Sequence, residues 1–455
     1  MSEERKHLFR LPIARIIKEK YEQKSLEIRD IALHLDSTIR KIKLIEIQEN
    51  FKDVYSKEQA QSLVDFLCIG PNEAVLSKED AEKYKSLLST WRKHINEGKL
   101  GSAVKLLENH SLDEITYLPF EHNLIMLYKL FDIKFIMAQR NFDLADKLLG
   151  AVEVRRLSPE NRYHYYYNMG SLHIHKKRYD LALRYYTKAN ETGFEDEQEY
   201  QQSLHFNLGL CYSKIGSYLR AILSFEKTDN LIKREGASFF PMYLDNSLGM
   251  NYIRIGELHL AKKRLSSCMR YAEALENKKY MGASLHNLGW LCLKEKNYDR
   301  AKDYFKRADA FFERGEDAFF ENLYYSIICL IKTEDFFTRV EIAFAERVAK
   351  EYNNKDYEVL YKTLPHLVTL QKEEKESSLK YIKDKTIPAL IRNFEYDKAA
   401  EYYEALENHF IKNGKALDAL EIKASSYELY KKMTQGGRAY EKKIDWPVPT
   451  FNTSS

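Results

Sequence analysis

Tyr167-Asn168-Met169-Gly170 is the first of four copies of one short pattern in the middle of this chain. The glycines of successive copies are 39, 40 and 40 residues apart. A fixed period of this length indicates stacked structural repeats rather than one closed core. The other three copies are Phe206-Asn207-Leu208-Gly209, Asn246-Ser247-Leu248-Gly249 and His286-Asn287-Leu288-Gly289.

Two further positions recur in phase with each glycine. The residue 12 places later is Ala182, Ala221, Ala261 or Ala301, and the residue 16 places later is Tyr186, Phe225, Leu265 or Phe305. This spacing is typical of a tetratricopeptide helix pair, in which small residues let two antiparallel helices approach and a bulky residue fills the gap to the next pair. The pattern predicts an all-α fold built around a right-handed tetratricopeptide-repeat superhelix, whose inner surface suits an extended ligand.

Composition is compatible with a folded, helix-rich chain. The chain has 455 residues, 44% of them hydrophobic, and a net charge of +4, which by itself does not require a polyanionic partner. We find neither a signal-peptide pattern at the N-terminus nor a long uncharged apolar run, so we expect a cytoplasmic protein without a membrane partner. The cysteines form no CxxC pair, and Cys211, Cys268 and Cys292 fall within repeat helices, where we expect buried thiols.

The repeat pattern extends in both directions from the four clear copies. Its alanine and bulky positions recur around Ala103, Ala145 and Ala399, whereas between residues 320 and 385 helical spacing persists without a clear register. We therefore predict a repeat solenoid over 78–433, followed by a flexible tail over 434–455 that contains two glycines and two prolines. Gly70-Pro71-Asn72 marks a linker at 70–77, and residues 1–69 form a separate module.

The N-terminal module has the layout of a helix-turn-helix. Apolar residues from Leu26 to Leu35 form one stripe, Asp36-Ser37-Thr38 offers a turn and a helix cap, and Ile42 and Ile45 begin a second stripe. The second helix presents an outward face without acidic residues, which suits phosphates and base edges. The alternative is a capping helical bundle whose basic residues are only solvated. The candidate DNA-binding residues are Thr38, Arg40, Lys41 and Lys43.

Asparagines recur on the first helix of each repeat pair. Because a side-chain amide offers both a donor and an acceptor, a row of them could bind the main chain of an extended peptide. Alternatively, the asparagines bond within or between helices. Nearby aromatics, among them Tyr243 and Trp290, could form side-chain pockets or belong to the core. The candidate peptide-binding residues are Asn168, Asn207, Asn246 and Asn287.

The sequence offers no enzyme motif. We find no phosphate-binding GxxxxGK[ST] loop, GxGxxG turn, GxSxG elbow or HExxH helix. We therefore assign no catalytic residue, no metal site and no cofactor.

Residues 26–46 resemble the helix-turn-helix of Xre and Cro-like repressors, at Leu26, Ile31-Ala32, Leu35 and Ile42 to Glu46. Such a module before repeats of about 40 residues resembles the Rap, NprR, PlcR and PrgX group of Gram-positive peptide receptors. The resemblance implies a short signalling peptide bound on the concave face of the repeats, a homodimer and control of promoter DNA. It implies, as an alternative, Rap-like dephosphorylation or sequestration of a response regulator.

A third alternative is a plain tetratricopeptide scaffold for a protein tail. Lys214, Arg254 and Lys294 recur one turn past the glycines, where cations could clamp a terminal carboxylate. Solvated side chains are the competing interpretation of these three residues.

Overall fold

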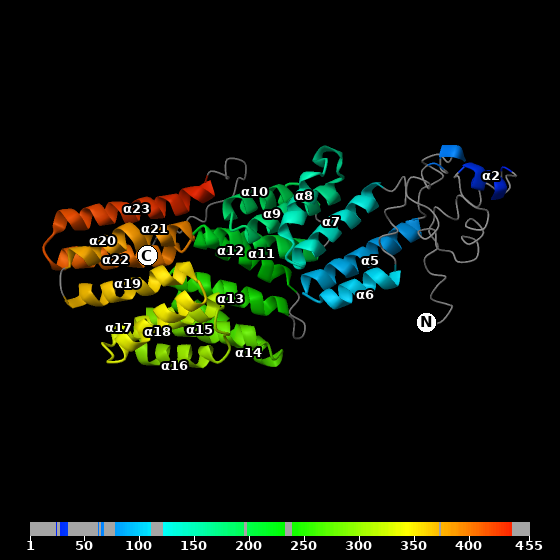
Figure 1. Cartoon of the computed structure of the whole chain (residues 1–455). Helices are drawn as coiled ribbons and strands as arrows, with labels where there is room; N and C mark the ends of the chain where they lie inside the picture. Colours follow the sequence, from blue (N-terminus) through cyan, green and yellow to red (C-terminus); the bar gives the residue numbers. More distant parts are fainter. Residues whose placement is uncertain are drawn as a thin grey trace, which may run out of the picture. The chain divides into compact units, whose positions relative to one another are not determined.

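The computed structural model describes residues 24, 28–34, 62, 65–67, 78–110, 122–194, 198–232, 239–372 and 375–438. Within these ranges every regular element is a helix and no strand occurs, which confirms the all-α fold class (Figure 1). The chain divides into two compact units: Met1–Lys177 with Thr187–Phe194, and Arg178–Tyr186 with Glu195–Ser455. We call them unit 1 and unit 2.

Unit 1 contains the first helices of the chain. Side-chain caps fix the starts of two of its helices, because a side-chain oxygen of Asn141 or Ser158 accepts a hydrogen bond from the backbone N–H three residues later. The helices are α2 (Ile28–His34), α5 (Lys78–Asn96), α6 (Leu100–His110), α7 (His122–Ala138), α8 (Phe142–Gly150), the 3₁₀ helix η4 (Val154–Arg156) and α9 (Pro159–His175). Helix α10 (Tyr179–Asn190) has residues in both units.

Unit 2 contains the remaining helices as a series of antiparallel pairs (Figure 1). The first four pairs are α11 (Gln198–Lys214) with α12 (Tyr218–Leu231), α13 (Phe239–Arg254) with α14 (Leu258–Ala274), α15 (Lys278–Lys294) with α16 (Tyr298–Asp309), and α17 (Asp317–Lys332) with α18 (Thr338–Glu351). They are followed by α19 (Lys355–Lys372), α20 (Glu376–Tyr381), the π-helical η5 (Ile382–Thr386), α21 (Ile387–Arg392), α22 (Tyr396–Lys412) and α23 (Ala416–Arg438).

The recurring glycines allow the two helices of each pair to touch. A Cβ atom added at Gly209 would lie 2.6 Å from the ring of Phe225, and one added at Gly289 would lie 2.7 Å from the ring of Phe305. Both rings are fully buried. The glycine and the bulky residue 16 places later are therefore the two sides of one contact, as the sequence predicts.

A π-helical turn lies at the end of the segment 320–385, in which the sequence register blurs. Helices α20, η5 and α21 follow one another without a break, and the i→i+5 bonds of η5 shift the helix face relative to an α-helical pattern. The hydroxyl of Thr386 in η5 lies 2.7 Å from the hydroxyl of Thr363 in α19, both fully buried. This change of helix type accounts for a shift of register only at the end of the segment 320–385, because α17, α18 and α19 are regular α-helices.

The two ends of the chain are described only in part. Helix α2 lies within the first predicted stripe of the helix-turn-helix, whereas Thr38, Arg40, Lys41 and Lys43 lie outside the described residues. Helix α23 continues through Gly436 and Gly437 to Arg438, past the end at 433 that we expect from composition. Glycine lowers helix stability without forbidding the helix, so two glycines do not end it. None of the described helices has the length and apolarity needed to cross a membrane.

Candidate functional site

Two of the candidate asparagines are bonded to each other. The amide nitrogen of Asn287 in α15 donates to the side-chain oxygen of Asn246 in α13, at 2.8 Å. The nitrogen of Asn246 lies 3.7 Å from the sulfur of Met250. These side chains therefore connect the first helices of two successive pairs, and Asn287 is only 4% exposed.

The other two candidate asparagines lie in different surroundings. Asn168 is buried in unit 1, where its amide nitrogen donates to the backbone carbonyl of Leu130 in α7 at 2.7 Å. Asn207 in α11 is half-buried. Asn168 and Asn287 thus both bond to the first helix of an adjacent pair, which makes interhelical bonding a feature of this position.

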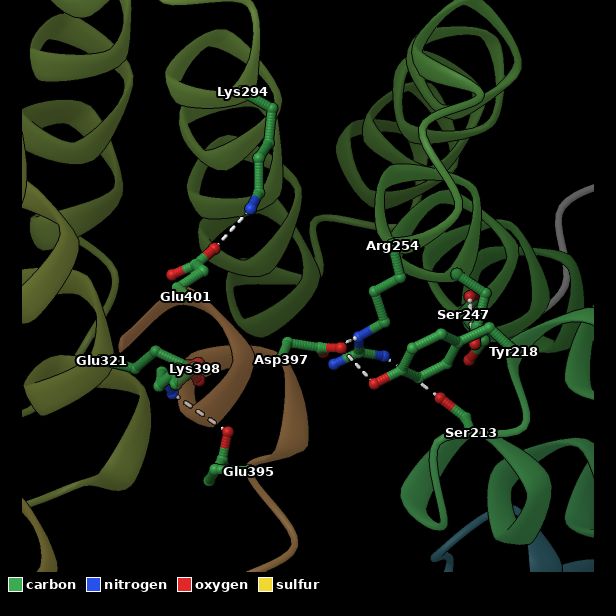
Figure 2. A network of polar contacts seen from close by, with 11 residues as sticks. Ser213, Tyr218, Ser247, Arg254, Lys294, Glu321, Glu395, Asp397, Lys398 and Glu401 are labelled. Atoms are coloured by element: carbon green, nitrogen blue, oxygen red, sulfur yellow. Dashed lines mark hydrogen bonds and ion pairs between the residues drawn. The ribbon is translucent and has the colours of Figure 1, made fainter. Parts of the chain in front are cut away.

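Two of the three recurring cations, Arg254 and Lys294, bond to a helix from the far end of the chain. In Figure 2 the side chain of Arg254, from the end of α13, points toward Asp397 of α22. The Nε atom of Arg254 lies 2.6 Å from a carboxylate oxygen of Asp397, and its Nη1 atom donates to the Ser213 hydroxyl at 3.1 Å. The hydroxyl of Tyr218 donates to the same carboxylate. From the sequence, Arg254 is either solvated or bound to a ligand. In the structure it forms an ion pair with Asp397 of the same chain.

Two more ion pairs connect α22 to the following pairs. Lys294 at the end of α15 bonds Glu401 (Figure 2). Lys398, only 2% exposed, lies 3.0 Å from Glu321 of α17 and 3.1 Å from Glu395. Helix α22 is therefore bonded to α13, α15 and α17 at once. We call these residues the α22 network: Ser213, Tyr218, Arg254, Lys294, Glu321, Glu395, Asp397, Lys398 and Glu401.

Burial and charge act against each other in the α22 network. Burial alone would lower the pKa of Arg254, but Asp397 and Tyr218 outweigh it and raise that pKa. Burial alone would raise the pKa of Glu321, yet the ammonium group of Lys398 lowers it to about 2. Both shifts favour the charged forms of Arg254 and Glu321.

A cleft of about 740 Å³ lies beside the Arg254–Asp397 pair, and we call it the tyrosine cleft. Trp290 lines it although only 4% exposed, and the Arg254 guanidinium lies 5.6 Å from the centre of the indole. The indole nitrogen has no hydrogen-bond partner among the described residues. Tyrosine and tryptophan side chains offer aromatic rings for stacking and O–H or N–H groups for hydrogen bonds to a ligand. Its aromatic lining is Tyr218, Trp290, Tyr396, Tyr427 and Tyr430.

A second cleft, of about 550 Å³, lies on the other side of the Lys294–Glu401 pair, and we call it the lysine cleft. Both clefts are lined by Lys294, Glu401 and Glu404, so the two share one border. The lysine cleft has an apolar floor and a basic rim. Its lining includes Leu293, Ile328, Leu367 and Leu370, together with Lys294, Lys296, Lys332, Lys412 and Asn408.

The sequence indicates the basic and aromatic residues of this site but not its acidic ones. It singles out Arg254, Lys294 and Trp290, but not the acidic residues of α22 that face them. Residues 394–403 carry a detectable repeat signal, and no local pattern shows that they pair with side chains more than a hundred residues earlier. Tyr243, the other aromatic that the sequence suggests for a pocket, lines neither cleft and packs on Tyr280.

Tetratricopeptide-repeat family models match residues 163–192 and 242–314. A relative in Geobacillus stearothermophilus, the transcriptional activator NprA, is 24% identical over 402 residues, covering 82% of this chain and 94% of that protein. The two family-model matches include the first, third and fourth copies of the repeat pattern.

Solved structures share the fold at low sequence identity. A Rap protein complexed with competence and sporulation factor matches with a TM-score of 0.66 and 17% identity, over 78% of this chain and 99% of the Rap chain. The apo quorum sensor NprR from B. thuringiensis matches with a TM-score of 0.60 and 17% identity, over 77% and 99%. NprR bound to its cognate peptide NprX matches at 0.55 and 19%, over 72% and 98%. The chain thus matches tetratricopeptide-repeat models over two segments and shares its fold with the Rap and NprR proteins over most of its length, which confirms the resemblance to that group.

Proposed function

We propose that this chain is a cytoplasmic receptor for a short signalling peptide and regulates transcription. The peptide part rests chiefly on the two clefts of unit 2, which meet at Lys294 and Glu401 and combine aromatic, apolar and charged surface. Sites of this composition suit an extended peptide, because pockets take side chains while polar groups orient the main chain. Two of the proteins that share the fold are complexed with peptides.

We also assign peptide contacts to Asn246 of α13 and Asn287 of α15, which do not line the two clefts. Their mutual bond uses one donor of Asn287 and one acceptor of Asn246, and each amide has further capacity to bind a peptide main chain. Asn168 and Asn207 remain candidates for the same role on the first helices of earlier pairs.

Binding of a mixture of randomised heptapeptides tests the receptor function. Peptides retained by the purified chain after rapid gel filtration are identified by mass spectrometry. We expect a retained subset, and weaker retention by a variant with Asn246→Ala and Asn287→Ala. A variant with exposed Lys278→Ala and Lys279→Ala is the matched control. Failure to retain any peptide would remove the receptor function.

The transcriptional part rests on the relative NprA, which is described as a transcriptional activator, and on the helix-turn-helix pattern. We assign DNA contacts to Thr38, Arg40, Lys41 and Lys43, and propose a homodimer because two half-sites need two reading helices.

DNA binding is tested with the DNA upstream of the chain's own gene. We expect affinity that falls with rising salt and that is lost when Arg40 and Lys41 are both changed to Ala. Arg155→Ala with Arg156→Ala, an exposed adjacent pair in η4, should leave the affinity unchanged. Equal loss in both double variants would contradict a specific reading helix.

A second candidate function is control of a response regulator. It is favoured by the fold shared with Rap proteins, including a structure described as aspartyl phosphate phosphatase F from Bacillus subtilis, with a TM-score of 0.50 and 14% identity. A folded chain that does not bind DNA but accelerates loss of phosphate from a response regulator, or sequesters it, would select this candidate.

A further inference from the structure

The lysine cleft carries an excess of positive charge over an apolar floor. Four lysines and two glutamates line it. One of the lysines, Lys294, is paired with Glu401. The amino groups of Lys296, Lys332 and Lys412 form no ion pair with any described residue, and all three side chains are exposed. The cleft as a whole therefore attracts an anion.

The floor indicates what accompanies that anion. Ile328 of α17 and Leu367 and Leu370 of α19 are half-buried and face the cleft together with Leu293 of α15. Apolar surface of this kind gains free energy when a ligand covers it. A small hydrophilic anion would leave these apolar side chains exposed to water. A ligand with an apolar side chain next to a carboxylate would cover them.

The border of the cleft already holds a carboxylate. Glu401 reaches Lys294 from α22, so this part of the cleft accommodates a carboxylate beside a lysine ammonium group. About two turns further along α22, Asn408 is exposed at the cleft and offers an amide to a peptide main chain. The positive charge of the lysines, the apolar floor and the amide of Asn408 therefore lie in one cleft, which is lined by α15, α17, α19 and α22.

We propose that the lysine cleft receives the C-terminal carboxylate and the last apolar side chains of an extended peptide. Lys332 and Lys412 hold the terminal carboxylate, and the floor takes the side chains next to it. This assignment rests on the proposed peptide-receptor function and adds the direction in which the peptide binds. The tyrosine cleft, across the Lys294–Glu401 border, then receives the residues nearer the N-terminus.

Two randomised heptapeptide mixtures, identical except that one ends in a free carboxylate and the other in an amide, test the direction. A charge-assisted hydrogen bond contributes about 1.5–3 kcal/mol, so we expect retention of the free acids to exceed that of the amides by about tenfold or more. Lys332→Met with Lys412→Met should abolish this preference. The matched control is Lys278→Met with Lys279→Met, at exposed positions at the start of α15.

The outcomes are distinguishable. Equal retention of acids and amides would leave the receptor function standing and overturn the carboxylate assignment. A preference for acids that survives in the Lys332 and Lys412 variant would overturn the assignment to this cleft. Enrichment of amidated peptides with acidic side chains would show an anion site that does not read the terminus. Retention from neither mixture would overturn both the inference and the receptor function.

Discussion

Arg254 and Asp397 are 143 residues apart in the sequence, and their side chains form an ion pair with 2.6 Å between Nε and a carboxylate oxygen. Arg254 ends the first helix of a repeat pair, while Asp397 lies in the first turn of α22. The pair therefore fixes the position of a late helix relative to a middle one.

Removing the charge of Asp397 should destabilise unit 2. Asp397→Asn keeps the side-chain size but leaves the Arg254 guanidinium, 16% exposed, without its counter-ion. Fully buried pairs cost about 3–5 kcal/mol when one partner is removed, and partial exposure reduces this to about 2 kcal/mol. Urea denaturation followed by circular dichroism measures the change. The control is Glu153→Gln, whose partner Arg156 is 82% exposed, where we expect less than about 1 kcal/mol.

Adding a methyl group at a repeat glycine should also destabilise the fold. Gly209→Ala brings a Cβ atom to within 2.6 Å of the buried Phe225 ring, which has no space to move away, so we expect a loss of about 1–3 kcal/mol. Gly101→Ala in α6 is the control, because nothing lies within 4 Å of its Cβ position and alanine favours a helix. Phe225→Leu should partly restore the stability of Gly209→Ala. A Gly209→Ala variant as stable as the wild type would contradict the close approach.

Acid should weaken the link between α22 and α17. The pKa of Glu321 falls from 4.5 to about 2 in the folded chain because Lys398 outweighs burial. A carboxyl group with a lowered pKa stabilises the fold above its ordinary pKa, and this stabilisation is lost as the pH falls from 4.5 to about 2.

Glu321→Gln should therefore lower the melting temperature at neutral pH and make its decline between pH 4.5 and about 2 shallower than in the wild type. Thermal scans across this range measure both effects. Glu428→Gln, which removes an exposed partner of Lys431, should leave the wild-type profile nearly unchanged. Identical slopes for Glu321→Gln and the wild type would show that the Lys398 pair does not control acid stability.

The described cysteines should be unreactive in the folded chain. Cys211, Cys268, Cys292 and Cys329 are buried and free, as the sequence indicates for the first three. Burial raises the pKa of Cys268 to about 11 and that of Cys329 to about 12, which leaves little thiolate near pH 8.

A Cys68→Ser variant restricts the measurement to these four thiols, because the chain has five cysteines. Titration with a thiol reagent should give a slow reaction in buffer and a fast reaction of all four thiols in denaturant. Fast labelling of one thiol in the folded chain would identify a helix pair that opens readily.

Sequence periodicity predicts the repeats well because each contact between Gly209 and Phe225, or Gly289 and Phe305, lies within one pair. Such contacts recur at fixed spacing and need no knowledge of the rest of the chain. The α22 network is different, because Asp397 and Glu401 meet Arg254 and Lys294 only after several pairs have stacked. The sequence therefore predicts the helices α13 and α15 and identifies Arg254 and Lys294 at their ends. It does not predict the carboxylates of α22 that pair with these two residues.

The asparagines illustrate a second limit. In-phase recurrence of Asn168 and Asn287 identifies one structural position correctly, but recurrence alone does not distinguish a ligand contact from a bond between neighbouring helices. The bond of Asn168 to the Leu130 carbonyl and that of Asn287 to Asn246 show that the position serves packing.

The stacking of α11, α13, α15 and α17 sets the length of extended peptide that unit 2 can span. These four helices contact one another in succession, and packed helices lie about 9 Å apart, so the row spans about 27 Å. An extended peptide rises about 3.4 Å per residue, which allows about eight residues across the row. Each added helix pair would lengthen the row by about 9 Å, which corresponds to about three peptide residues. The number of stacked pairs would therefore determine the length of peptide that the proposed receptor binds.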